Sequence, residues 1–166
     1  DIGRMEALCR DRGALAVLPA ADAARREALW GIRRQISTRI HESAPVYLSE
    51  DVAVPIARIP DLIAALPALG RRHNLSLYAF GHAGDGNIHV NITGDTDCRP
   101  RTLTLARELI ALVLDLGGTM SGEHGIGMAK RPFIDMVLSP RSISLQHSLK
   151  AVFDPAGLMN PGKVLP

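Results

Sequence analysis

Two histidines that flank a glycine-rich turn give the strongest chemical signal in the sequence. Residues 81–91 read GHAGDGNIHVN, with His82 before the turn and His89 after it. Residues 84–87 have the composition of a tight hairpin loop. If they form that loop, His82 lies opposite His89, with Cβ atoms about 5 Å apart on one face. Two imidazoles at that spacing can bind one metal ion; alternatively, both are ordinary polar side chains on an open face.

A second chemical cluster lies at residues 121–127, which read SGEHGIG. Its three glycines suit close approach of the backbone to a ligand. Glu123 and His124 can point in different directions in an irregular loop, so that one completes the metal site and the other stays free. Two histidines, a carboxylate and an open position are the usual set of a catalytic zinc centre, and they also suit manganese or ferrous iron. The segment does not have the metalloprotease order His-Glu-x-x-His. Taken alone, it is explained equally well as a solvent-exposed loop with a chance Glu-His pair.

Helical and strand patterns alternate around these two clusters. Strand patterns cover residues 45–55, 75–80 and 88–92. Helical patterns cover residues 3–10, 22–41, 60–72, 101–116, 132–138 and 140–153. We expect Pro67 to kink or shorten the third helix, and Gly117 and Gly118 to end the fourth in the left-handed conformation. Short connections between mixed elements predict an α+β fold, in which helices pack on one side of an antiparallel sheet.

Composition excludes several classes of protein. The 166 residues are 46% hydrophobic and 22% charged, as in an ordinary globular domain. A net charge of +2 with scattered basic residues argues against a nucleic-acid partner. The apolar stretch 62–69 is far shorter than the roughly 20 residues that a transmembrane helix needs. Cys9 and Cys98 lack metal or redox spacing, which favours reduced thiols in the cytoplasm.

No flavin or dinucleotide fingerprint is visible in the sequence. A Gly-x-Gly-x-x-Gly segment would have to follow a strand and open a helix, whereas Gly84 and Gly86 lie inside the predicted hairpin. The sequence begins at Asp1 rather than Met, and a helical pattern is already present by residue 3. We therefore expect this chain to be one domain of a longer protein.

Taken together, these features resemble the C-terminal domain of the FAD-linked oxidase family. That family includes the glycolate oxidase flavin subunit, D-lactate dehydrogenase and D-2-hydroxyglutarate dehydrogenase. The matching stretches follow the family's order: LWGIR at 29–33, EDVAVP at 50–55, the segments 81–91 and 117–132, FDP at 153–155 and NPGKVL at 160–165. The resemblance implies a ferredoxin-like fold, a preceding flavin-binding domain that holds most of the FAD, and oxidation of a small 2-hydroxy acid to the 2-oxo acid. The isolated domain would then be inactive.

The resemblance also implies a role for each site residue. A divalent metal, zinc or manganese, would be bound by His82, His89 and Glu123, with His124 as the catalytic base. The substrate would be bound by Arg33, Ser37 and Asn91, with Arg33 pairing with its carboxylate. The FAD would be contacted by Asn160 and Lys163, although packing of the tail explains these two residues as well. A solvated position on the first long helix likewise explains Arg33.

One position departs from the family pattern. Some relatives carry a substrate-holding lysine immediately before the Glu-Asp pair, where this chain has Ser49. The change favours a small acid such as glycolate or D-lactate over a dicarboxylate such as 2-hydroxyglutarate. By itself, Asp51 of that pair has the appearance of a surface charge at the end of a strand.

Two other functions are compatible with the sequence. A non-catalytic metal-binding or interaction module would bind metal but no hydroxy acid, and a metal-assisted hydrolase would need only the metal, water and His124. The electron acceptor stays open. We expect a cytoplasmic protein, with attachment to the periphery of the inner membrane through partners as an alternative.

Overall fold

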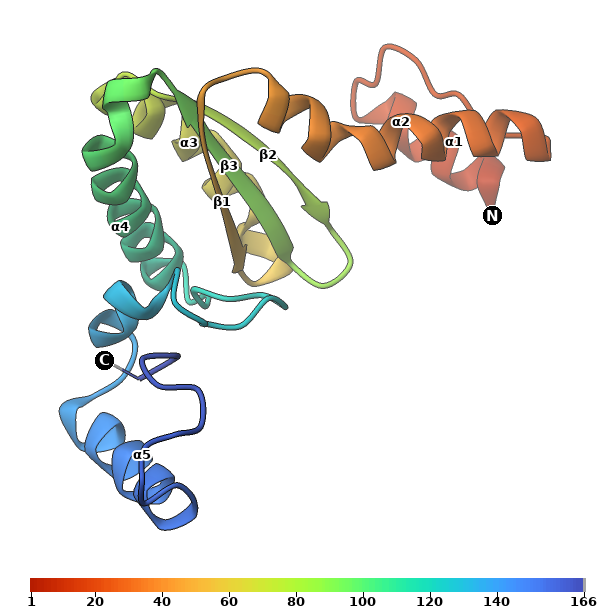
Figure 1. The fold of residues 1–166 in the computed structure, drawn as a ribbon. Coiled ribbons are helices and arrows are strands. Elements are labelled where there is room, and N and C mark those ends of the chain that lie inside the picture. Colours follow the sequence, from red (N-terminus) through yellow and green to blue (C-terminus); the bar gives the residue numbers. More distant parts are fainter. Residues whose placement is uncertain (166) are drawn as a thin grey trace. The chain divides into compact units, whose positions relative to one another are not determined.

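Three antiparallel strands position the predicted site (Figure 1). They are β1 (Val46–Ala53), β2 (Ser76–His82) and β3 (Asn87–Gly94), arranged in the order β1-β3-β2. Helix α3 (Ile59–His73) connects β1 to β2, and helix α4 (Arg99–Asp115) follows β3. A single antiparallel bridge joins Ala53 to Thr119 after α4. The α+β prediction is confirmed, and the edge strand that would complete a ferredoxin-like sheet beside β1 is reduced to this one bridge.

One face of the sheet forms the hydrophobic core with α3 and α4. Along β3, alternate residues Ile88, Val90 and Ile92 are at most 4% exposed. Leu62 of α3 and Leu109 of α4 are fully buried against this layer. Helix α3 lies against β2, α4 lies against β1, and the two helices contact each other. The helices therefore pack on one side of the sheet, as predicted. Because successive side chains of a strand point to opposite faces, the residues between the apolar ones lie on the second face, which α3 and α4 do not cover.

That second face carries the polar side chains of the predicted site. Asp51 of β1 lies opposite His89 of β3, and Ser49 lies opposite Asn91. Asp51, His89 and Asn91 are 1%, 9% and 0% exposed. Buried polar groups need partners, because an unpaired one loses its hydration without compensation. The partners of these three side chains therefore define the site.

The register of the hairpin differs from the prediction. Residues 83–86 form the loop, so that His82 pairs with Asn87, and Phe80 rather than His82 lies opposite His89. A hydrogen bond to the residue after β1 holds this turn in place: the N–H of Val54 donates to the carbonyl of Gly86. Gly86 itself has a φ of +80°. A side chain could not fit there, since a Cβ on Gly86 would lie 2.0 Å from the carbonyl oxygen of Val54. The cross-strand partner of His82 is thus Asn87 instead of His89, two residues away. His82 therefore stays on the same face as His89 but lies diagonally from it.

Most predicted helices are confirmed, and two details are wrong. Helix α3 is not shortened at Pro67 but continues to His73, because Leu66 and Leu69 beside the proline are buried in the core and stabilise the helix without that backbone donor. Only Gly117, not Gly118, adopts a positive φ at the end of α4. The segment predicted at 132–138 is the 3₁₀-helix η3 (Arg131–Met136), and α5 (Pro140–Phe153) follows it. Two further 3₁₀-helices are η1 (Ile56–Arg58) and η2 (Thr96–Cys98).

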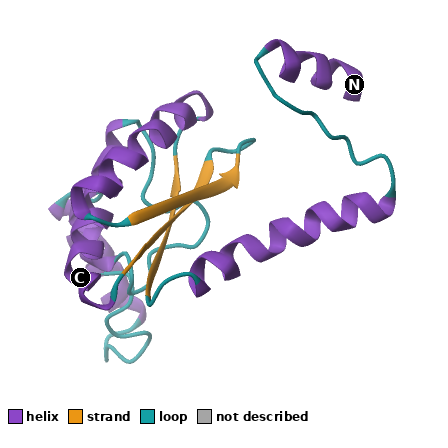
Figure 2. Cartoon of the chain, turned by 90° about the horizontal axis from the view of Figure 1, so that it is seen from above, coloured by secondary structure: helices purple, strands orange, loops and turns teal. Residues whose placement is uncertain are grey.

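The structure describes residues 1–165, which divide into two units, 1–39 and the remainder from residue 40. The first unit contains α1 (Ile2–Asp11) and most of α2 (Ala23–Glu42), drawn as purple helices in Figure 2. The boundary falls inside α2, so no change of composition marks it in the sequence. Within the described residues, no helix is both long and apolar enough to cross a bilayer.

Replacing Leu109 by Ala should destabilise the fold strongly. Leu109 is fully buried between α4 and the sheet, and such truncations cost about 2–5 kcal/mol through lost burial and the cavity left behind. Leu103→Ala is the matched control, because Leu103 lies on the same helix and is 56% exposed. Urea unfolding should show a clear fall in the free energy of unfolding for Leu109→Ala only. Equal losses for the two variants would contradict the assignment of the core face.

Candidate metal centre

The polar face of the sheet and the loop after α4 bring four metal-binding side chains together. One ligand atom from each of Asp51, His89, Glu123 and His124 lies within 4.8 Å of the other three. The Nε2 atom of His89 is 3.6 Å from Oε1 of Glu123, and Nε2 of His124 is 3.9 Å from the same oxygen. The rings of His89 and His124 stack with their centroids 5.5 Å apart. Two histidine motifs separated by more than 30 residues therefore meet at one point.

These distances fit a divalent metal. Bonds of about 2.1 Å in a tetrahedral site place two ligand atoms about 3.4 Å apart, close to the 3.6 Å between Nε2 of His89 and Oε1 of Glu123. Burial lowers the pKa of His89, and the proximity of His124 adds to this effect against the opposing charge of Asp51. His89 is therefore neutral at neutral pH, as a metal ligand must be. Glu123 and His124 are exposed, which leaves one side of the cluster open to a small molecule.

His82 stands outside this group of four. Its ring centroid is 5.8 Å from that of His89, and its side chain is exposed at the end of β2. The diagonal register explains this spacing, since Phe80, and not His82, lies directly across from His89. His82 remains a predicted ligand, with an exposed side chain on the same face of the sheet as His89.

Asp51 anchors the loop that carries Glu123 and His124. Its Oδ2 atom accepts hydrogen bonds from the backbone N–H groups of Gly122, Glu123 and His124, at 3.0, 2.8 and 2.9 Å. Burial alone would raise the pKa of the Asp51 carboxyl, but these backbone donors and the charge of Lys130 outweigh it and lower the pKa. The expectation of a surface charge at Asp51 is wrong, because the loop covers the carboxylate. The sequence alone does not indicate this role, because the pairing of Asp51 with His89 depends on the register between β1 and β3.

A buried lysine supports the same loop from the core side. The ammonium group of Lys130 donates to the backbone carbonyl of Asp51 and, at 2.6 Å, to that of Met120. Its Nζ is 3.9 Å from a carboxylate oxygen of Glu50. Burial raises the pKa of Glu50 to about 7, although the charge of Lys130 opposes this change. Lys130 thus links β1 to Met120, which lies just before the loop that carries Glu123 and His124.

Asn91 is held in one orientation beside the cluster. Its Oδ1 accepts a hydrogen bond of 2.6 Å from the hydroxyl of Tyr47, and its Nδ2 donates to the carbonyl of Tyr78 at 3.4 Å. The ring of His41 meets that of Tyr47 edge to face, with centroids 4.8 Å apart. Ser49 is exposed and lies across from Asn91 on the same face. A group bound over the metal cluster would therefore have Ser49 among its neighbours.

The other four predicted residues are not among the side chains of this cluster. Arg33 and Ser37 are four residues apart on α2, so they share one side of that helix within the first unit. Asn160 and Lys163 belong to one turn, in which the N–H of Lys163 donates to the carbonyl of Asn160 at 3.3 Å. The ammonium group of Lys163 also contacts the sulfur of Met128 at 3.0 Å, which ties the tail to the segment after the site loop.

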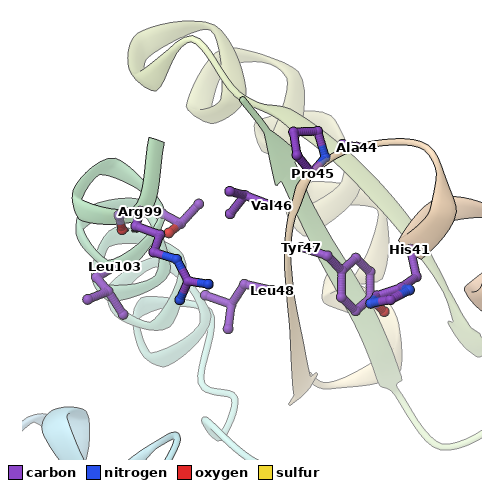
Figure 3. Close-up of a pocket in the computed structure, with 9 residues that line it drawn as sticks. His41, Ala44, Pro45, Val46, Tyr47, Leu48, Arg99 and Leu103 are labelled. Atoms are coloured by element: carbon purple, nitrogen blue, oxygen red, sulfur yellow. Dashed lines mark hydrogen bonds between the residues drawn. The ribbon is translucent and has the colours of Figure 1, made fainter. Parts of the chain in front are cut away.

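The cavity shown in Figure 3 is separate from the candidate site. It has a volume of about 370 Å³ and lies between the outer edge of β1 and α4. Val46 and Leu48 point toward Arg99 and Leu103, whereas Tyr47 points away from them toward His41 (Figure 3). None of the predicted site residues lines this cavity.

Comparison with known proteins places the chain in one group. The family described as FAD linked oxidases, C-terminal domain, matches residues 1–164. The chain is 34% identical to the glycolate oxidase subunit GlcD of Bacillus subtilis over 99% of its own length, and 37% identical to a probable mitochondrial D-lactate dehydrogenase of Danio rerio over 96%. It is 34% identical to D-2-hydroxyglutarate dehydrogenase of Stutzerimonas stutzeri over 82%. The chain spans 36%, 33% and 30% of the lengths of these relatives, or about a third.

Replacing Gly122 by Ala should open the metal cluster. An added Cβ would lie 2.3 Å from Oδ1 of Asn87 and 3.0 Å from Oδ1 of Asp51, both of which are buried. We expect weaker Zn²⁺ binding in a calorimetric titration and a loss of about 1–3 kcal/mol in the free energy of unfolding. Gly84→Ala is the control, because a Cβ there meets nothing within 4 Å. Wild-type Zn²⁺ affinity in Gly122→Ala would show that the loop does not depend on this close approach.

Proposed function

The chain belongs to the family of FAD linked oxidase C-terminal domains, and we propose that it binds the metal and the substrate of an enzyme that oxidises a small 2-hydroxy acid. The observation that carries this proposal is the convergence of His89, Glu123 and His124 on the open polar face of the sheet. The names of the relatives support the substrate class, since they refer to glycolate, D-lactate and D-2-hydroxyglutarate. As the chain spans about a third of these relatives, we infer that a preceding flavin-binding domain supplies the rest of the active site.

We assign the metal to His82, His89 and Glu123. A bound divalent ion would lower the pKa of the substrate hydroxyl, as it does for coordinated water. His89 contributes a neutral imidazole, and Glu123 contributes charge at the exposed rim of the cluster. Zinc and manganese both suit two imidazoles and one carboxylate. The ion's identity follows from elemental analysis of the purified protein.

His124 is the base in this proposal. Its Nε2 lies at the exposed side of the cluster, 3.9 Å from the Glu123 carboxylate, where it can accept the proton of a hydroxyl held at the same point. Asn91 presents a side chain oriented by Tyr47, and Arg33 with Ser37 offers a guanidinium and a hydroxyl from one side of α2. In this proposal Asn91 contacts the acid while His124 takes the proton, and Arg33 and Ser37 stay predicted substrate contacts by the resemblance to the family. A bound FAD would supply the acceptor for the hydride of C2.

Asn160 and Lys163 are the groups that this chain offers to the flavin. Both line one cavity, whose walls also include Phe153 and Met159. An ammonium group beside an apolar and aromatic wall suits a cofactor that combines a planar ring with anionic phosphates. The chain would add these contacts to those of the preceding domain.

Replacing His124 by Ala should separate chemistry from metal binding. In the complete enzyme, we expect kcat with glycolate or D-lactate to fall by about 100-fold or more, because a positioned general base is lost. Metal content, measured by elemental analysis, should stay close to that of the wild type. His89→Ala is the comparison variant and should lose both activity and metal. A normal oxidation rate in His124→Ala would refute the assignment of the base.

Replacing Ser49 by Lys should shift the preference toward dicarboxylates. Ser49 is exposed across from Asn91, so that a lysine there would place a cation beside the bound acid. We expect kcat/KM for D-2-hydroxyglutarate, divided by that for D-lactate, to rise by about 10-fold or more, as one new charged hydrogen bond would give. Ser144→Lys on α5 is the control for a change of net charge, since Ser144 is exposed away from the sheet. An unchanged ratio in Ser49→Lys would remove Ser49 as the determinant of substrate size.

A further inference from the structure

We propose that Asp51 is the positioning residue of the metal centre, with one carboxylate that fixes both the ring of His89 and the loop that carries Glu123 and His124. This role rests on the proposed metal site, to which it adds a residue that does not itself touch the ion or the substrate. It also gives a reason why a charged side chain on the edge strand β1 is only 1% exposed.

The Oδ2 atom of Asp51 fixes the loop. Three consecutive backbone N–H groups, those of Gly122, Glu123 and His124, point at this one oxygen. The hydroxyl of Ser121 lies 3.5 Å from it and also accepts from the N–H of Gly125 at 2.8 Å. A carboxylate that accepts several backbone hydrogen bonds holds the backbone in one conformation, because a change of that conformation would break several charge-assisted hydrogen bonds at once. The directions of the Glu123 and His124 side chains follow from that conformation.

The Oδ1 atom of Asp51 faces the ring of His89. It is buried, has no hydrogen-bond partner, and lies 3.6 Å from Nδ1 of His89. A carboxylate on this side of the ring favours the tautomer with a proton on Nδ1. The lone pair is then on Nε2, which faces Glu123. Carboxylate–histidine–metal arrangements of this kind orient the ring and increase the basicity of the ligating nitrogen.

The geometry favours this role over direct coordination by Asp51. Its Oδ2 is already surrounded by three backbone donors, and its Oδ1 lies on the Nδ1 side of the imidazole. The two nitrogens of one imidazole point in different directions. Nε2 of His89, which faces Glu123 and would hold the ion, is therefore a different atom from Nδ1, which faces Oδ1 of Asp51. Lys130, which donates to the backbone carbonyl of Asp51, supports this part of β1 from the core side.

The test compares Asp51→Asn with the wild type in the complete protein, using Zn²⁺ alone as the probe. The amide keeps an oxygen that can accept from the loop, but its NH₂ group can replace the acceptor that faces Nδ1 of His89. We expect Zn²⁺ affinity to fall by about 10- to 100-fold, as for other groups that orient a metal ligand. Asp135→Asn is the matched control and should bind Zn²⁺ normally, because Asp135 is an exposed partner of Arg107. Equal affinity in Asp51→Asn and the wild type would overturn the proposal while leaving the metal site intact.

A second measurement needs no variant and covers the case in which Asp51→Asn fails to fold. Nitrogen-15 NMR of the histidine rings in the Zn²⁺-loaded wild type should show His89 with a proton on Nδ1 and metal on Nε2. Metal on Nδ1 of His89 would overturn the proposal, because Asp51 would then share the ion. A wild-type protein that binds neither Zn²⁺ nor Mn²⁺ would overturn both the metal site and the role of Asp51.

Discussion

The hydrogen bonds between one buried carboxylate and three consecutive backbone N–H groups hold the functional part of this fold together. Asp51 lies on β1, whereas Gly122 and its two neighbours lie about 70 residues later, in a loop with little apolar surface of its own to bury. Without a fixed acceptor, such a glycine-rich loop would lose too much conformational entropy on ordering to keep its side chains in one place. The anchor lies on the same strand face as His89, so the loop and the hairpin share a single reference point.

The sheet can carry a polar site without losing stability because its two faces have different side chains, apolar on one and polar on the other. Alternate residues of β3 are apolar and face α3 and α4, where they supply the burial that stabilises the domain. The intervening residues, His89 and Asn91, face the other way and are free to be polar. Lys130 and Glu50 are polar exceptions that are also buried near the site, with Nζ of Lys130 3.9 Å from a carboxylate oxygen of Glu50. The ammonium group of Lys130 donates a hydrogen bond to the carbonyl of Met120, just before the loop, where the apolar side chains of the core offer no donor.

The fold was largely predictable because its signals are local. Apolar spacing located the strands and the long helices, and Gly117 marked the end of α4. The site was predictable only in outline. The motifs identified His89, Glu123 and His124, but not their distances, and the assumed loop at 84–87 placed His82 opposite the wrong residue. The contact of Gly86 with Val54 fixes that loop, and no local pattern contains it.

The sequence by itself determined the alternation of elements, the polar composition of the two histidine motifs and the resemblance to a family. Each of these depends on residues that are neighbours along the chain or on stretches of fixed order. Only the tertiary structure decided that Asp51 is buried, that His82 lies diagonally from His89, and that Lys130 reaches the carbonyls beneath the loop. These facts depend on strand register and on contacts between distant segments. A two-residue change of register preserves the face of every side chain but changes its partner, so hydrophobic patterning constrains the face and leaves the partner undetermined.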